Sequence, residues 1–259
     1  MSTGLIAARA GGPRGGSIVT IGATQARGVG GLLAAAFHNE RVTRWLVPDP
    51  ARRPHAIGAL FTGLVLDAFA TGSVDVLTDE SDRPVAAAVW FDHTTPATDG
   101  EPAAGPPAGS PLAPGEAQRW LLLDAAMTGR HPRPVHEYLM LVGVHPALQG
   151  HGLGARLLGH HHRRLDAAGT PAYLEATSPA SRALYQRLGY TDHGPVIRPA
   201  AGAAAPDDAR NDGRGDGRDG GEPVLWPMWR RPRGIDVRIP GVVASVRADG
   251  ARHETRRDT

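Results

Sequence analysis

The sequence predicts a single domain of the α/β (α+β) class. The first observation is a nearly unbroken apolar run at residues 138–144, which is typical of a strand buried on both faces. The second is the glycine-rich turn that follows this run and leads directly into a segment with helical spacing. The third is the order of the remaining elements, because strands and helices alternate through the C-terminal half, as in a sheet covered by helices.

The individual elements follow from hydrophobic spacing and from turn residues. Thr24 is placed to cap the first helix, and Ser178 to cap the last, with Pro179 at its first position. Ala180, Leu184 and Leu188 are expected to form the buried stripe of that last helix. The predicted strands cover 18–21, 73–78, 84–92, 138–144, 171–176, 190–197 and 223–230, and the predicted helices 25–37, 52–70, 116–128, a segment ending near 168, and 179–188.

The domain is expected to cover residues 17–232. Residues 1–16 are small, glycine-rich and aperiodic, so they are interpreted as a disordered leader. Two stretches rich in small residues, near 94–115 and 199–221, are interpreted as flexible insertions, and 233–259 as a polar tail.

Composition excludes several classes of function. The 259 residues include no cysteine, which excludes disulfides, thiolate metal sites and a cysteine nucleophile. The net charge is only +2 and the arginines are scattered, so no nucleic-acid partner is expected. No apolar run approaches the roughly 18 residues of a membrane span. We therefore expect a cytoplasmic protein with no membrane partner, and the sequence leaves its oligomeric state open.

Three consecutive histidines, His160, His161 and His162, lie in the predicted helix that ends near residue 168. Consecutive helical side chains point about 100° apart, so these three cannot bind one metal ion together. The pattern favours a solvated helix face, and no metal is expected.

The turn after residue 144 indicates either a site for a ligand that carries phosphate or a purely structural turn, and its spacing alone does not decide between them. Gly150, Gly152 and Gly154 let the backbone approach a ligand closely, and a helix starts immediately afterwards. Unpaired N–H groups and the helix dipole at such a position favour an anion. The Lys and Ser/Thr of a P-loop are missing, and the glycine spacing fits the dinucleotide fingerprint poorly.

The same residues resemble a known family. The stretch Gln149-Gly150-His151-Gly152-Leu153-Gly154 is similar to the Q/R-x-x-G-x-G/A pattern of GNAT N-acetyltransferases, and residues 183–190 (ALYQRLGY) resemble the family's L-Y-x-x-x-G-F/Y. The likeness is strongest to the actinobacterial branch of puromycin N-acetyltransferase, through residues 33–37, 87–90, 142–144 and 171–175. It implies one mixed, mostly antiparallel twisted sheet with splayed central strands and flanking helices.

The resemblance also implies a reaction: direct transfer of an acetyl group, in a ternary complex, from acetyl-CoA to a primary amine of a small molecule. A protein or peptide N-acetyltransferase, or a non-catalytic sensor of acyl-CoA, remains an alternative. Gly143 is expected to form a bulge that splays the central strand. The residues implied in binding acetyl-CoA are Val142, Gly143, Val144, Gln149, Gly150, His151, Gly152, Leu153, Gly154, Ala155 and Ser181.

Two catalytic residues are implied. Tyr185 matches the family tyrosine that protonates the departing thiolate, and a phenol with a pKa near 10 suits that role. Glu137, at the start of the central strand, is the first choice for the general base. Glu175, His136 and His145 are its rivals.

Overall fold

The computed structural model describes residues 16–94, 105–199 and 222–234. Nearly all of the predicted leader (1–16) and of the tail (233–259) lies outside these residues. The same holds for most of the insertion predicted at 199–221 and for about half of that predicted at 94–115.

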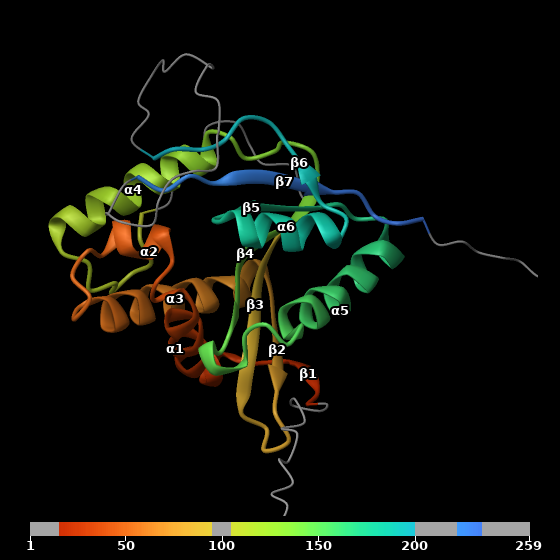
Figure 1. The fold of residues 1–259 in the computed structure, drawn as a ribbon, viewed down its shortest axis with the longest axis horizontal. Helices are drawn as coiled ribbons and strands as arrows, with labels where there is room; N and C mark the ends of the chain where they lie inside the picture. Colours follow the sequence, from red (N-terminus) through yellow and green to blue (C-terminus); the bar gives the residue numbers. More distant parts are fainter. Residues whose placement is uncertain (1–15, 95–104, 200–221, 235–259) are drawn as a thin grey trace, which may run out of the picture.

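A seven-stranded sheet organises the described residues, in the order β1-β2-β3-β4-β5-β7-β6 (Figure 1). Neighbouring strands are antiparallel throughout, except for β4 and β5, which are parallel. The mixed, mostly antiparallel sheet expected from the sequence is therefore confirmed. The strands are β1 (Ile18–Thr20), β2 (Gly72–Thr78), β3 (Pro84–His93), β4 (His136–Val144), β5 (Ala172–Ala176), β6 (Thr191–Asp192) and β7 (Trp226–Arg230).

Helices cover both faces of the sheet (Figure 1). Alternate residues of β3 show the two layers, because Ala87 and Val89 pack with α1 and α3, whereas Ala88 and Trp90 pack with α5. The helices are α1 (Ala26–Phe37), α2 (Arg41–Leu46), α3 (Arg53–Thr71), α4 (Pro114–Thr128), α5 (Leu153–Ala168) and α6 (Pro179–Arg187), with short 3₁₀ turns η1 (Ala23–Gln25) and η2 (Pro146–Leu148).

Most predicted elements are present, but the structure differs from the prediction in three places. Thr24 does not cap α1, because it lies inside η1 and Gln25 occupies the cap position. The strand predicted over 190–197 shrinks to β6 and an isolated bridge between Ile197 and Leu225. Helix α2 was not predicted, because six residues are too few to show a helical period.

Helix α6 begins as predicted and buries a different residue. Ser178 caps it, with its hydroxyl oxygen accepting the N–H of Ser181 at 3.1 Å. The predicted stripe is wrong, since Ala180 is exposed and Leu184 and Leu188 are half-buried. Tyr185 is the residue that α6 buries.

The histidine run of α5 also differs from the prediction. His161 and His162 are buried, with 0% and 4% of their surface exposed, so the solvated-face interpretation is wrong for both. They lie one turn beyond Leu157 and Leu158, on the stripe that packs against the sheet. Only His160 of the three faces outward and is half-buried.

Gly143 does not form the expected bulge. The register shift lies at Met140, because Val89 pairs with Leu141 whereas Trp90 pairs with Leu139. Gly143 pairs regularly, and a Cβ there would lie 2.9 Å from the Cβ of Ala36. The glycine therefore permits close packing of α1 on the strand.

Helix α3 is long and apolar enough, by length and composition, to cross a membrane. In the structure it is a core helix, since it packs against α1 and the sheet. Its buried residues are Arg53, Ala56, Ile57, Leu60, Phe61, Leu64, Val65 and Ala68.

The contact between α1 and α3 is close enough to test. A Cβ on Gly30 would lie 2.2 Å from Oγ1 and 2.8 Å from the backbone N of Thr62. We expect Gly30→Ala to lower the free energy of unfolding by about 1–3 kcal/mol, because the helices must move apart. Gly31→Ala is the matched control: a Cβ there meets nothing within 4 Å, so helix propensity should stabilise the protein by up to about 1 kcal/mol. Urea unfolding of both variants measures the difference, and equal effects would contradict the packing account.

Candidate active site

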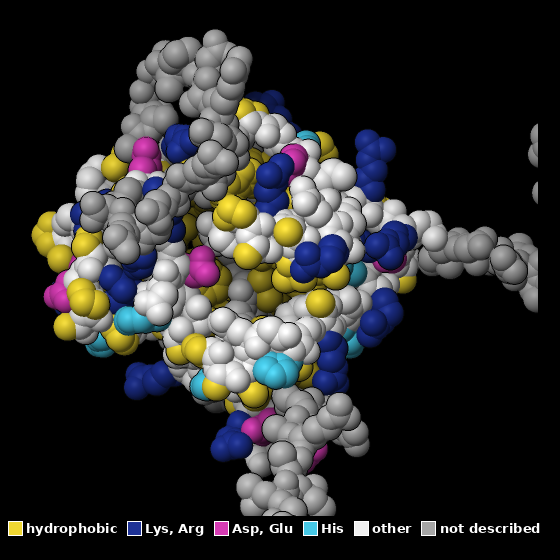
Figure 2. Space-filling model, in the orientation of Figure 1, with side chains coloured by type: hydrophobic (Ala, Val, Ile, Leu, Met, Phe, Trp, Pro, Cys, Tyr) yellow, Lys and Arg dark blue, Asp and Glu magenta, His cyan; other side chains and the backbone are white. Residues whose placement is uncertain are grey.

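The parallel strands β4 and β5 part in the middle of the sheet. Their pairing ends at Leu139 and Leu174, although β4 continues to Val144, bonded to β3, and β5 continues to Ala176, bonded to β7. The bulge at Met140 lies where the pairing stops, and a bulge bends the strand that carries it. Figure 2 shows a hollow near the centre of this face, between α6 and the turn before α5, with hydrophobic side chains around it.

The turn between β4 and α5 presents a row of unpaired amides. Gly150 and Gly152 have φ angles of 79° and 76°, in the left-handed region that favours glycine. Gly152 is also the N-cap of α5. Among the described residues, no acceptor pairs with any of the six N–H groups from Gly150 to Ala155. They lie at the positive end of a helix dipole, which makes them an anion site.

Side chains of the turn hold this backbone in place. Gln149 Nε2 donates to the carbonyl of Val144 at 3.2 Å, which ties the turn to the end of β4. The ring of His151 folds back, with Nδ1 2.9 Å from the carbonyl oxygen of Gln149. Both side chains thus shape the turn, leaving the main-chain N–H groups for a ligand.

Tyr185 lies on α6, beside the parted strands. It belongs to the same core cluster as Leu174 of β5, and its hydroxyl has no hydrogen-bond partner among the described residues. Burial, and secondly the negative charge of Glu40, raise the pKa of Tyr185 well above its usual value of 10. The phenol therefore holds its proton more tightly than an ordinary tyrosine, so the shift does not itself favour transfer of that proton to a thiolate.

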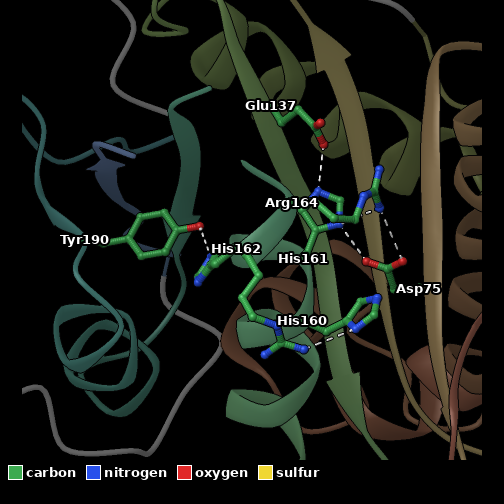
Figure 3. Close-up of polar contacts among 8 residues, drawn as sticks. Asp75, Glu137, His160, His161, His162, Arg164 and Tyr190 are labelled. Carbon is green, nitrogen blue, oxygen red and sulfur yellow. Dashed lines mark hydrogen bonds and ion pairs between the residues drawn. The ribbon is translucent and has the colours of Figure 1, made fainter. Parts of the chain in front are cut away.

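Glu137 faces α5, where a buried histidine holds it (Figure 3). His161 Nε2 lies 2.7 Å from Glu137 Oε2, and its Nδ1 lies 2.6 Å from Asp75 Oδ2. The ring stacks on Trp90 at a centroid distance of 3.9 Å. Burial opposes protonation of His161, but the hydrogen bonds and charges of both carboxylates outweigh it and raise the pKa above 6.5. One ring thus links β2, β4 and α5, and its surroundings favour the protonated form.

Glu175 has a different environment on the opposite face of the sheet. Its Oε2 accepts the hydroxyl proton of Tyr138 at 2.7 Å, whereas Oε1 is buried with no partner among the described residues. Burial raises the pKa of Glu175 to about 7, although the nearby hydroxyls of Tyr138 and Tyr173 oppose the shift. The residue follows Leu174, where the strands part. A carboxylate that titrates near neutral pH, with an unused oxygen, is suited to accept a proton.

The other two candidate bases are less suitable. His145 is exposed, and its Nδ1 accepts the N–H of Ala147 at 3.3 Å within the turn. His136 is buried, and its two ring nitrogens contact Pro134 and His131. His145 follows the end of β4 and His136 begins it, so neither ring lies at the level where the pairing of β4 and β5 stops.

Residues 121–192 match the family model of the acetyltransferase (GNAT) domain. This segment contains β4, the turn, α5, β5 and α6.

Solved structures similar over most of the chain have the same fold. A protein from Corynebacterium glutamicum described as histone acetyltransferase and related acetyltransferase is 24% identical, with a TM-score of 0.55 over 86% of this chain and 99% of that one. The polyamine N-acetyltransferase of Drosophila melanogaster is 19% identical, with a TM-score of 0.52 over 83% and 100%. Arylalkylamine N-acetyltransferase 2 from Aedes aegypti is 11% identical, with a TM-score of 0.53 over 84% and 99%.

The chain has the GNAT fold. The parting of β4 and β5 is the splay expected of that fold, and the unpaired amides lie at the end of β4 where GNAT proteins carry the Q/R-x-x-G-x-G/A pattern. The structure brings together the predicted residues 142–144 and 149–155. Their role in binding acetyl-CoA stays a prediction.

Ser181 has another use in this structure. Its hydroxyl donates to the carbonyl of Ser178 at 3.0 Å, and its oxygen accepts the N–H of Ser178 at 3.1 Å. These bonds complete a capping box at the start of α6. A contact from Ser181 to acetyl-CoA stays a prediction, and it would have to compete with the capping box.

Several polar residues of the site were not found from the sequence. The helical period through Leu157, Leu158 and Leu165 does place His161 on the buried face, so a signal existed for that residue. No local pattern pairs it with Asp75, which is 86 residues away. Glu40 gave no signal either, although its carboxylate accepts a hydrogen bond from Thr177 and burial raises its pKa.

The charge on His161 should appear in the pH dependence of stability. The pKa of His161 is raised in the folded state. Its contribution to the free energy of unfolding is therefore complete below about pH 6.5 and is lost as the pH rises through the folded pKa. We expect His161→Gln to lower the free energy of unfolding by about 3–5 kcal/mol at pH 6, because it removes the cation that Glu137 contacts and leaves Asp75 with only Arg164, at 3.8 Å. The difference from the wild type should shrink as the pH is raised to 9.

Urea unfolding at several pH values measures this effect. His160→Gln, one residue away and half-buried, is the control, and it should change stability by no more than about 0.5 kcal/mol. A wild-type minus His161→Gln difference that does not vary with pH would contradict a charged His161.

Proposed function

We propose that the chain transfers an acetyl group from acetyl-CoA to a primary amine of a small molecule. The observation that carries the proposal is the row of six unpaired N–H groups at Gly150–Ala155, next to the parting of β4 and β5. A diphosphate fits such a row, since each N–H can donate to a phosphate oxygen at a helix N-terminus. The unpaired edge of β4, over residues 140–144, offers backbone groups to an extended, amide-containing arm.

The residues would divide the chemistry between them. The thioester supplies the acetyl group, and a backbone N–H of β4 beside the bulge would polarise its carbonyl. The new N–C bond forms as the C–S bond breaks. Glu175 takes the proton that the amine releases, and the Tyr185 hydroxyl donates its proton to the departing sulfur, which balances the reaction.

Glu175 is a better base than Glu137 in this proposal. The Glu137 carboxylate is engaged by His161, on the α5 face. Glu175 alternates with Leu174 and so points to the opposite face, with a pKa of about 7 and an unused oxygen. Tyr138, Tyr173 and Asp124 are the titratable groups around it.

A small-molecule acceptor is the working hypothesis. The Drosophila melanogaster and Aedes aegypti proteins of similar fold are described as acting on polyamines and arylalkylamines, and the sequence resembles the puromycin N-acetyltransferase branch. Glu40, near Tyr185, adds a carboxylate that could attract an ammonium group. Thiol release with a panel of small amines and free N-terminal peptides tests this. Turnover of peptides alone would indicate a protein acetyltransferase, and binding without turnover a sensor.

Binding of acetyl-CoA can be tested at Gly152. We expect Gly152→Val to weaken binding at least tenfold in calorimetry, because the side chain disfavours the left-handed backbone and crowds the amides. Gly169→Val is the matched control, since Gly169 has a φ of 68° at the other end of the same helix. It should lose stability but keep its affinity. Equal affinity of the two variants, or no binding by the wild type, would contradict the proposed site.

The role of Glu175 can be tested by the pH dependence of the rate. We expect kcat/KM to rise with pH through an apparent pKa near 7, because the base must be deprotonated. Glu175→Gln should reduce kcat by about 10²–10⁴-fold and remove this limb. The exposed Glu80→Gln is the control and should behave as the wild type. Retention of the limb in Glu175→Gln would exclude Glu175 as the base, and its loss in Glu137→Gln alone would assign the base to Glu137.

A further inference from the structure

Three histidines from separate parts of the chain meet at the start of β4. His93 ends β3, His136 begins β4, and His131 lies in the loop between α4 and β4. One ring nitrogen from each lies within 4.8 Å of the other two. We propose that His93, His131 and His136 form a binding site for one divalent transition-metal ion, with Zn²⁺ the best fit.

The hydrogen bonds of His136 orient its lone pair toward the cluster. Its Nδ1 lies 2.7 Å from the carbonyl oxygen of Pro134, which can only accept, so Nδ1 carries the hydrogen. In a neutral ring Nε2 then presents a lone pair, and this atom lies 3.0 Å from His131 Nε2. A ring nitrogen bonded to a carbonyl, with the other nitrogen facing the metal, is the usual arrangement for a metal-binding histidine.

The spacing also suits zinc. Zn–N bonds of 2.0–2.1 Å at tetrahedral angles place two ligand nitrogens about 3.3 Å apart. The His131 and His136 nitrogens need to move by only a few tenths of an ångström to reach that spacing. His93 approaches from the other strand, with its ring centroid 4.6 Å from that of His131 and 5.2 Å from that of His136. Three histidines would leave a fourth position for water.

Aromatic side chains surround the cluster. Tyr173 packs on His131 and His136, and Trp229 packs on His136, which is only 1% exposed. Among the described residues, the bond between His131 and His136 is the one hydrogen bond that joins the three rings. Three neutral imidazoles with one hydrogen bond among them stabilise one another little in this setting. A metal cation would instead bind a nitrogen lone pair of each ring.

The site is separate from the row of amides proposed to bind acetyl-CoA. It lies at the start of β4, while the row of amides follows the end of that strand. A bound ion would tie β3, β4 and the loop after α4 together. It would also fix Tyr138, which packs on His131 at 4.9 Å and donates to Glu175. The sequence led us to expect no metal, because the three residues are spread over 44 positions and only the fold brings them together.

Metal titration tests the proposal directly. The protein, freed of any histidine tag and stripped with a chelator, is titrated with Zn²⁺ by calorimetry and with Co²⁺ by visible absorption. We expect one ion of either metal per chain, a tetrahedral Co²⁺ spectrum, and a higher melting temperature with Zn²⁺. His131→Ala and His93→Gln should each weaken binding at least tenfold. His55→Ala, at an exposed position on α3, should bind as the wild type.

Two results would overturn the proposal: the absence of stoichiometric binding by the wild type, or unchanged binding by both ligand variants. Circular dichroism establishes that each variant is folded. The test of the half-exposed His93 remains decisive if His131→Ala does not fold. Acetyl-CoA affinity measured on the same samples is expected to be the same in wild type and variants, which keeps the metal site distinct from the proposed function.

Discussion

The parting of two parallel strands is the constraint on which the rest of the site depends. A sheet satisfies its backbone groups by pairing, so a strand that leaves its neighbour in the middle of a sheet needs another partner. The bulge at Met140 bends β4 away just where its pairing with β5 stops. The parting gives a ligand access to the edge of β4 from residue 140 onward, and it ends at the turn where the amides of α5 are unpaired. The unpaired strand edge and the unpaired amides thus follow one another along the same stretch of chain.

The buried chain of Asp75, His161 and Glu137 sets the position of α5 relative to that break. His161 is the point where the helix is bonded to β2 and β4 at once, and Trp90 of β3 stacks against it. A buried ionic contact of this kind is weak evidence for stability, but it restricts geometry strongly because each partner left alone is costly. Its consequence here is that α5 is attached through His161 to both β2 and β4.

Local patterns predicted the individual strands and the glycine-rich turn, because each is formed by contiguous residues, whereas the mixed, mostly antiparallel sheet was implied by the family resemblance. The apolar run before Val144 and the glycines at 150, 152 and 154 identified the central strand and the phosphate-type turn without any tertiary information. What the sequence could not give was long-range polar pairing. Tyr138 and Glu175 are 37 residues apart, and nothing in either neighbourhood indicates that they bond. The bulge was predicted at Gly143 because glycine is typical of bulges. In the structure, the glycine instead leaves room for α1 to pack against the strand.

The central claim is that the main chain from Gly150 to Ala155 binds the diphosphate of acetyl-CoA. Amide hydrogen exchange with and without saturating acetyl-CoA measures those N–H groups themselves. The account predicts marked slowing of exchange in peptides covering 149–156 and along the unpaired part of β4, with little change on the exposed face of α3. Unchanged exchange at 149–156 while acetyl-CoA is bound would place the nucleotide elsewhere and contradict the account.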